Sequence, residues 1–132
     1  MNGEIRRITP EVMFARHSFT AEERSIMARW LPMCDPLAMG LLGEELICFL
    51  GLIPPTVLSD EAYIWLLPMP ALEQHPVGFG RFAIRFLREA LRRYPTIYGH
   101  CTRDSWRWLH SLGAQINGVD GDQFKFIIQR SE

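Results

Sequence analysis

The sequence predicts a single α/β (α+β) domain over residues 1–132, with a central sheet flanked by helices. Three observations carry this prediction. The stretch Ala62–Leu67 is apolar like a buried strand, a glycine turn (Gly78-Phe79-Gly80) follows it, and a long amphipathic helix, Gly80–Tyr94, comes next. Glycines at a helix start let backbone N–H groups approach an anion closely, so this order predicts a phosphate-binding turn.

The N-terminal residues are expected to form one strand and two helices. The strand is Glu4–Ile8 and the first helix is Glu11–His17. The second helix, Ala21–Leu31, begins with a capping box, because the Thr20 hydroxyl and the Glu23 carboxylate can satisfy each other's free amides.

The middle of the chain indicates a hairpin followed by a central strand. Two apolar runs, Leu37–Leu42 and Glu45–Leu52, are separated by the turn residues Gly43-Glu44. The next strand, Ala62–Leu67, is apolar almost throughout, which is typical of a strand buried on both faces. We therefore expect it at the centre of the sheet.

The long helix Gly80–Tyr94 has an apolar face and a basic face. The apolar face carries Ala83, Leu87, Ala90, Leu91 and Tyr94. The basic face carries Arg81, Arg85, Arg88 and Arg92. Arg81, at the helix start, is placed to meet a nucleotide phosphate. The other arginines are interpreted as a solvated surface, with contact to a partner protein or nucleic acid as the alternative.

The C-terminal part is expected to add three strands and one helix. In chain order these are the strand Thr96–Cys101, the helix Arg103–Leu112, and the strands Ala114–Asn117 and Gln123–Gln129. Thr102 is placed to cap the helix, and Gly113 to end it in a left-handed conformation. The last two strands are expected to flank a turn at Gly118–Gly121.

Composition argues against several classes of function. A net charge of -1 gives no bulk preference for nucleic acid or an anionic membrane. Cys34, Cys48 and Cys101 lack C-x-x-C spacing, which argues against a disulfide framework and a zinc site. We expect an intracellular protein, because the start lacks a signal-like apolar stretch and no later segment is long enough to span a bilayer. We also expect no metal site, because the sequence has no H-x-x-x-H or similar spacing.

The expected order, β-α-α-β-β-β-α-β-α-β, resembles the GCN5-related N-acetyltransferase (GNAT) fold, which has a mixed, mostly antiparallel sheet. Before its long helix, that family carries Gln or Arg, two variable residues, Gly, one variable residue, and Gly or Ala. Here His75-Pro-Val-Gly78-Phe-Gly80 keeps both glycines and has His75 in the leading place. The resemblance implies an acetyl-CoA or coenzyme A site, with backbone groups of Leu67 and Met69 on the pantetheine. The implied cofactor-binding residues are Leu67, Met69, Val77, Gly78, Phe79, Gly80, Arg81 and Thr102.

The chain departs from the family pattern near the helix that precedes Gly113. Thr102 stands where the family typically has Asn, and Ala114 where it has Phe. Leu109 stands where the family commonly has a Tyr that reprotonates the leaving thiolate of coenzyme A. A leucine cannot donate a proton, so the resemblance implies binding without the usual acid.

His100 and Cys101 are the catalytic candidates. They lie near the end of the strand beside the expected cleft, where a base or a nucleophile would face an amine or a thioester. The alternative interpretation is a buried or hydrogen-bonded pair without a chemical role.

A narrower resemblance is to small GNAT-like proteins of tailed phages, some described as internal virion proteins and others as acetyltransferases. Its residues are Glu61-Ala-Tyr-Ile-Trp-Leu-Leu67, Glu73-Gln-His-Pro76, Arg92-Arg-Tyr-Pro95, Ser105-Trp-Arg-Trp-Leu-His-Ser-Leu-Gly113 and Asp122-Gln-Phe-Lys-Phe126. The resemblance implies a virion-assembly or DNA-ejection accessory with a degenerate acyl-CoA cleft. Its partners would be other virion proteins, and its place the host cytoplasm and the virion.

The alternative function is an active acetyl-CoA-dependent N-acetyltransferase that transfers an acetyl group to an amine. Leu109 favours the accessory protein, whereas Gly78 and Gly80 favour the enzyme. A third interpretation, nucleic-acid binding through the arginine-bearing helix, predicts steep salt dependence.

Overall fold

The computed structural model describes residues 3–56, 58–102, 106 and 109–130. Seven strands form one sheet in the order β1-β2-β3-β4-β5-β7-β6, in which β4 and β5 are parallel and the other neighbours are antiparallel. The strands are β1 (Gly3–Arg7), β2 (Leu37–Leu42), β3 (Glu45–Ile53), β4 (Glu61–Pro68), β5 (Thr96–Cys101), β6 (Gln115–Asp120) and β7 (Gln123–Gln129). The predicted fold class, a mixed and mostly antiparallel sheet flanked by helices, is confirmed.

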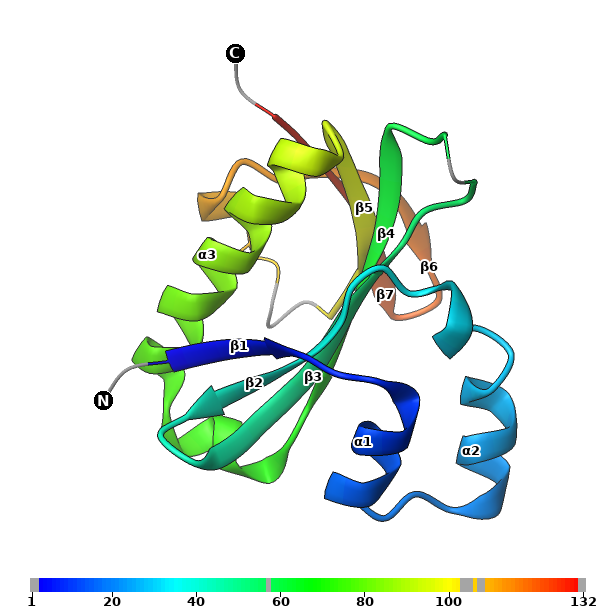
Figure 1. The fold of residues 1–132 in the computed structure, drawn as a ribbon. Coiled ribbons are helices and arrows are strands. Elements are labelled where there is room, and N and C mark those ends of the chain that lie inside the picture. Colours follow the sequence, from blue (N-terminus) through cyan, green and yellow to red (C-terminus); the bar gives the residue numbers. More distant parts are fainter. Residues whose placement is uncertain (1–2, 57, 103–105, 107–108, 131–132) are drawn as a thin grey trace.

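Helices cover both faces of the sheet (Figure 1). Helix α3 (Pro76–Arg93) lies on one face, and helices α1 (Pro10–Arg16) and α2 (Ala21–Met27) lie on the other. Two short 3-10 helices, η1 (Leu31–Met33) and η2 (Pro70–Gln74), complete the connections. Because each face of β3 has its own helical cover, β3 is buried from Ile47 to Leu52.

Two of the predicted helices have different ends. Helix α2 stops at Met27 rather than Leu31, because the backbone tightens to i→i−3 hydrogen bonds before η1. Helix α3 begins at Pro76 rather than Gly80. Proline is favoured in the first helical position, and the Phe79 N–H already donates to the His75 carbonyl at 2.9 Å. The glycines of the predicted turn therefore lie inside the first turns of the helix.

The C-terminal predictions were met in part. The expected helix Arg103–Leu112 lies largely outside the described residues, although residues 109–111 are helical. Gly113 has a φ of 92°, as expected of a left-handed terminator. Strand β6 runs to Asp120 rather than Asn117, so the turn before β7 falls at Gly121, where φ is 65°.

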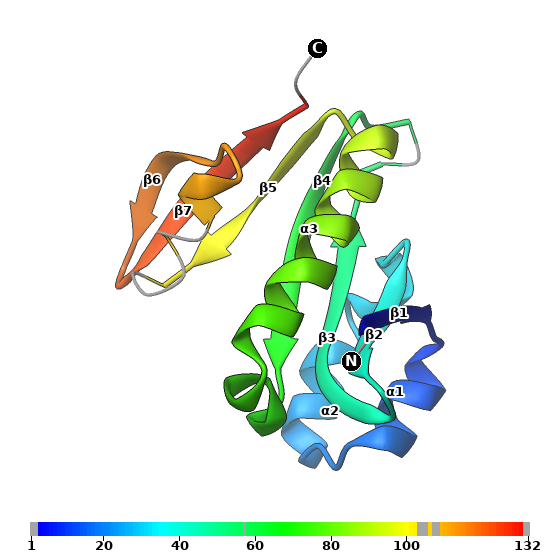
Figure 2. The ribbon, with the colours of Figure 1, turned by 90° about the vertical axis from the view of Figure 1, so that its left-hand side faces the viewer.

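Strand β4 is central, as predicted, but it is not buried on both faces. Ala62 is fully buried, whereas Leu66 is 42% exposed. The reason is that β4 pairs with β5 only over Glu61–Tyr63, opposite Thr96–Tyr98. Beyond these pairs the two strands diverge toward the end of the molecule that holds the start of α3 (Figure 2). Strand β4 therefore stays partly exposed beyond Tyr63, where β5 no longer pairs with it.

Gly99 lies just past the last β4–β5 pair. A Cβ atom at this position would meet the carbonyl oxygen of Ile64 and the ring of Phe126, both at 2.9 Å. Real Cβ atoms essentially never approach backbone so closely. The absence of a side chain at Gly99 thus permits the close approach from which the strands diverge.

Candidate functional site

A cavity of about 500 Å³ lies between β4 and β5, where the strands have separated. Its walls come from β4, β5 and α3, and most of its lining side chains are apolar. The polar lining residues are His100, Thr102 and Gln123. Of the site residues predicted from sequence, Phe79, His100, Cys101 and Thr102 line this cavity.

Val77, Gly78, Gly80 and Arg81 lie in the first turns of α3. The start of α3 lies at the end of the molecule toward which β4 and β5 diverge (Figure 2). The first N–H groups of a helix have no partner within it, and the proline at position 76 has none to offer. The N–H groups of Val77 and Gly78 therefore have no partner within the helix. No acidic residue occupies this first turn, so its positive partial charge is not offset locally.

The backbone of β4 aims Leu66, rather than Leu67, toward the gap. The Met69 N–H donates to the Ile47 carbonyl of β3 at 2.9 Å. Residues of an antiparallel strand alternate between facing their partner and facing away from it. Leu67 and Met69 thus direct their backbone groups to β3, which works against the predicted pantetheine contact, while Leu66 directs its N–H and C=O to the β5 side.

His75 takes the leading place of the glycine motif, and its side chain is held by β3. Its Nε2 lies 2.8 Å from Oε1 of Glu45. This contact fixes the residue that precedes α3 against the end of the sheet. It therefore positions the helix start beside the cavity.

His100 connects two other side chains. Its Nδ1 lies 3.0 Å from the Tyr63 hydroxyl, and its Nε2 lies 3.6 Å from Oδ2 of Asp120. Nε2 is buried and has no hydrogen-bond partner within the described part of the chain. The nearby carboxylate favours a proton on Nε2, which leaves Nδ1 to accept the Tyr63 O–H. Burial raises the pKa of Tyr63, so its hydroxyl keeps that proton.

The other predicted catalytic candidate has an unfavourable environment for a nucleophile. Cys101 is only 7% exposed, and burial raises the pKa of its thiol. A raised pKa lowers the thiolate fraction at neutral pH. Leu109 also lines the cavity and is buried, so the position of the family's acid is filled by an apolar side chain.

A second cavity, of about 540 Å³, lies on the opposite side of β4 and is lined by α2 and its flanking residues. Trp65 and Leu66 line both cavities. Tyr63 lines the second cavity, whereas its hydrogen-bond partner His100 lines the first. The two cavities therefore meet across the middle of β4.

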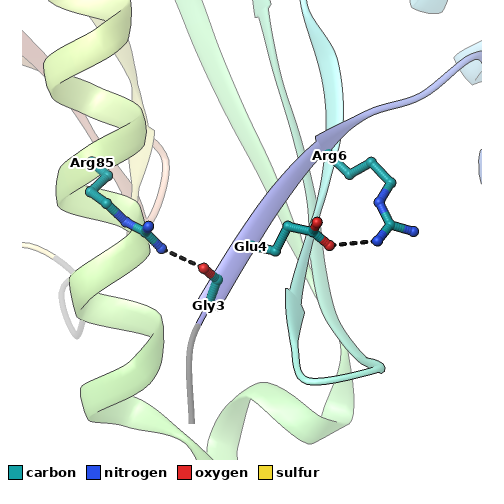
Figure 3. Close-up of polar contacts among 4 residues, drawn as sticks. All are labelled: Gly3, Glu4, Arg6 and Arg85. Atoms are coloured by element: carbon teal, nitrogen blue, oxygen red, sulfur yellow. Dashed lines mark hydrogen bonds and ion pairs between the residues drawn. The ribbon is translucent and has the colours of Figure 1, made fainter.

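Two arginines of the basic face of α3 have partners within the chain. Arg85 donates to the Gly3 carbonyl at 2.7 Å and so ties α3 to the edge strand β1 (Figure 3). Arg92 donates to Oε1 of Glu89 at 3.0 Å. These contacts give part of the basic face a structural role within the chain.

Sequence reasoning did not single out Tyr63 or Asp120 as site residues. Tyr63 was counted only as an apolar strand residue, and Asp120 as part of a turn. Their meeting depends on which strands are neighbours in the sheet, and β5 brings them together at His100. The period of a strand shows which face a residue is on, but not which strand lies beside it.

Neither a protein-family model nor a curated protein sequence matches the chain. Solved structures do match over nearly the whole length. An acetyltransferase from Bacillus subtilis in complex with CoA has a TM-score of 0.71 at 11% identity, covering 98% of this chain and 99% of that one. Spermidine N-acetyltransferase from Vibrio cholerae, in complex with CoA and spermine, has a TM-score of 0.71 at 14% identity, covering 97% and 95%. The ribosomal-protein-S18-alanine N-acetyltransferase from Escherichia coli has a TM-score of 0.69 at 14% identity, covering 98% and 95%.

The chain has the GNAT fold. Identities this low show the fold alone, so activity and ligands need their own argument. The comparisons give no support to the narrower resemblance to phage internal virion proteins.

No group of three or more His, Cys, Asp or Glu side chains among the described residues could hold a metal ion. No described helix is both long and apolar enough to cross a membrane.

Proposed function

We propose that this GNAT-fold chain is an acetyl-CoA-dependent N-acetyltransferase, which transfers an acetyl group to an amine. The observation that carries the proposal is the cavity between the diverged strands β4 and β5, which opens beside the start of α3. Similar structures from B. subtilis and V. cholerae are described as complexes with CoA. In this chain, the cavity and the start of α3 offer the apolar wall and the backbone N–H groups that CoA requires.

The residues present fit acetyl-CoA. The N–H groups of Val77 and Gly78, with Gly80 and Arg81 beside them, suit a pyrophosphate. Leu66 offers backbone N–H and C=O groups to the pantetheine amides in place of Leu67 and Met69, and Phe79 and Thr102 line the path. When bound, acetyl-CoA supplies the activated acetyl group. The protein holds that group in an apolar cavity, away from bulk water.

Thermal unfolding with and without acetyl-CoA tests the proposal. A ligand that binds only the native state stabilises it by about 2.7 kcal/mol at a concentration of 100 Kd. For a domain of this size, we expect a rise in Tm on the order of 10 °C. Gly78→Glu places bulk and negative charge at the pyrophosphate site and should abolish this rise.

The matched control is Gln129→Glu. It adds the same charge at an exposed position, paired with Thr96 at the closed end of the β4–β5 junction. This variant should keep the full rise in Tm. No rise with acetyl-CoA for the native chain, or an undiminished rise for Gly78→Glu, would contradict the assignment of the site.

The second candidate function is the phage accessory protein with a degenerate cleft. Leu109, buried at the cavity wall where the family has its acid, is the observation that favours it. Virion partners, a host-cytoplasm or virion location and nucleic-acid binding all stay predictions. Acetyl-CoA binding without acetyl transfer to any amine would favour this candidate over the enzyme.

A further inference from the structure

The cavity on the α2 side of β4 has an almost wholly apolar wall. Its lining includes Phe19, Ile26, Trp30 and Trp65, and Glu23 is the one charged residue among its described lining residues. Ile26 and Leu66 both line this cavity and are 53% and 42% exposed, so apolar surface is open to a ligand there.

The charge of this cavity restricts what it can hold. The Glu23 carboxylate accepts the Thr20 backbone N–H at 2.8 Å in the capping box, so part of its capacity is already used. One partly engaged carboxylate cannot neutralise several ammonium groups, and burying an unpaired charge is costly. An apolar body with a single amine fits this wall, whereas a polyamine does not.

Among the described lining residues of this cavity, Tyr63 carries a hydroxyl group. It is hydrogen-bonded to His100, which lines the acetyl-CoA cavity on the other side. Asp120 lies at the far nitrogen of His100 and is exposed to solvent. The three side chains thus form a line from the second cavity, past the first, to the protein surface.

We propose that the second cavity is the acceptor site for a primary monoamine with an apolar body, and that Tyr63 passes the proton of its ammonium group to His100. This inference rests on the proposed function. It assigns the acceptor class and the proton-handling residues to the transferase site.

An ammonium group loses two protons when its nitrogen becomes an acetylated amide nitrogen. The first goes to the Tyr63 oxygen as the Tyr63 O–H proton moves to Nδ1 of His100, and Asp120 stabilises the resulting imidazolium. The freed amine attacks the thioester carbonyl carbon, and the C–S bond breaks. The second proton, from the attacking nitrogen, goes to the thiolate that leaves. His100 returns its proton to solvent beside Asp120.

A series of amines tests the acceptor class. The rate of free-thiol release from acetyl-CoA is measured with ethylamine, propylamine, butylamine, 2-phenylethylamine and spermidine. Each further buried CH₂ should raise kcat/KM by roughly fourfold. We expect 2-phenylethylamine to exceed spermidine by at least about tenfold, because the apolar wall must desolvate the extra ammonium groups of spermidine.

Tyr63→Phe tests the proton path. General acid–base groups contribute about 10²–10⁴-fold, so kcat for 2-phenylethylamine should fall within that range. Activity of the variant should rise with pH as the free-amine fraction rises, a dependence that a packing defect would not produce. The titratable groups around His100 are Tyr63 from β4, Asp120 from β6, and Lys125, which pairs with it from β7.

Tyr98→Phe is the matched control. It removes the same atom from a ring 5.6 Å from that of Tyr63, between ring centroids, and should leave kcat within about twofold of the native value. Equal activities of the two variants, or faster turnover of spermidine, would overturn the inference. So would a chain that binds acetyl-CoA but acetylates no amine of the series. Failure of acetyl-CoA to raise the Tm would instead overturn the proposed function.

Discussion

Strands β3 and β4 are neighbours with similar apolar sequences, yet one forms the core and the other forms cavity walls. Leu50 and Leu66 are directly paired across the two strands, and they are 2% and 42% exposed respectively. Strand β3 pairs with β2 from Glu45 to Gly51 and with β4 from Cys48 to Ile53, and helices cover both of its faces. Strand β4 loses β5 after three pairs. Composition therefore measures how apolar a strand is, while its neighbours determine whether it is buried.

The sharpest test of this comparison is the pair of variants Leu50→Ala and Leu66→Ala. Truncating a fully buried leucine costs about 2–5 kcal/mol, from lost transfer energy and the void left behind. Leu50→Ala should therefore lower the free energy of unfolding by about 2–5 kcal/mol, whereas Leu66→Ala should lower it by less than about 1 kcal/mol. Urea unfolding followed by tryptophan fluorescence measures both. Equal losses would mean that Leu66 is packed as tightly as its partner.

Gly99→Ala tests the junction itself, with the next largest effect. The added methyl group would meet the Ile64 carbonyl at 2.9 Å, so the two strands must move apart where they now touch. Overpacking of this kind costs about 1–3 kcal/mol. The change in unfolding free energy gives the cost, and Gly118→Ala, where the nearest atom is the flexible side chain of Lys125 at 3.2 Å, is the control. An unchanged free energy of unfolding for Gly99→Ala would show that a methyl group fits between the two strands.

Thr20→Ala has the smallest expected effect and acts on the helix that covers the second cavity. The capping box of α2 joins the Glu23 N–H to Thr20 Oγ1 at 3.1 Å, and its loss should cost about 1 kcal/mol. The hydrogen bonds from Thr20 lower the pKa of Glu23 below its ordinary value of 4.5. The contribution of Glu23 is therefore fully present above pH 4.5 and is lost as the pH falls through the lower, folded-state pKa.

Stability measured against pH checks this sign. The native chain should lose stability between pH 4.5 and lower values more steeply than Glu23→Gln, which has no carboxylate to titrate in the capping box. Parallel curves for the two proteins would contradict the assignment of the shift to the capping box.

Local features of the fold could be predicted because they depend on neighbours in the chain. The capping box of Thr20 and Glu23, the hairpin at Gly43 and the left-handed Gly113 follow from residues a few positions apart, and the structure confirms all three. The start of α3 was placed four residues late, because Gly78 and Gly80 suggested a turn, while Pro76 was a suitable first helical residue.

The site was harder to predict, because it depends on strands that meet from distant parts of the chain. Phe79, Thr102 and His100 were expected beside a cleft, and they line one. Leu67 and Met69 are expected at the pantetheine, but which residues of β4 direct their backbone groups to β3 depends on the pairing of the two strands, and the sequence does not specify that pairing. The contact of His100 with Tyr63 needed the parallel pairing of β4 and β5, which no local pattern encodes.

The three β4–β5 pairs also join two otherwise separate groups of strands. On one side of these pairs lie β1 to β4, and on the other lie β5, β7 and β6. Antiparallel pairing holds each group together. The sheet thus consists of two groups of strands that only the three β4–β5 pairs join, and a short ladder resists twisting less than a long one. A ligand in the cavity between the diverged strands would contact both groups of strands, because residues of β4 and of β5 line that cavity. Such a ligand would therefore add contacts between two groups that the sheet itself joins through three residue pairs.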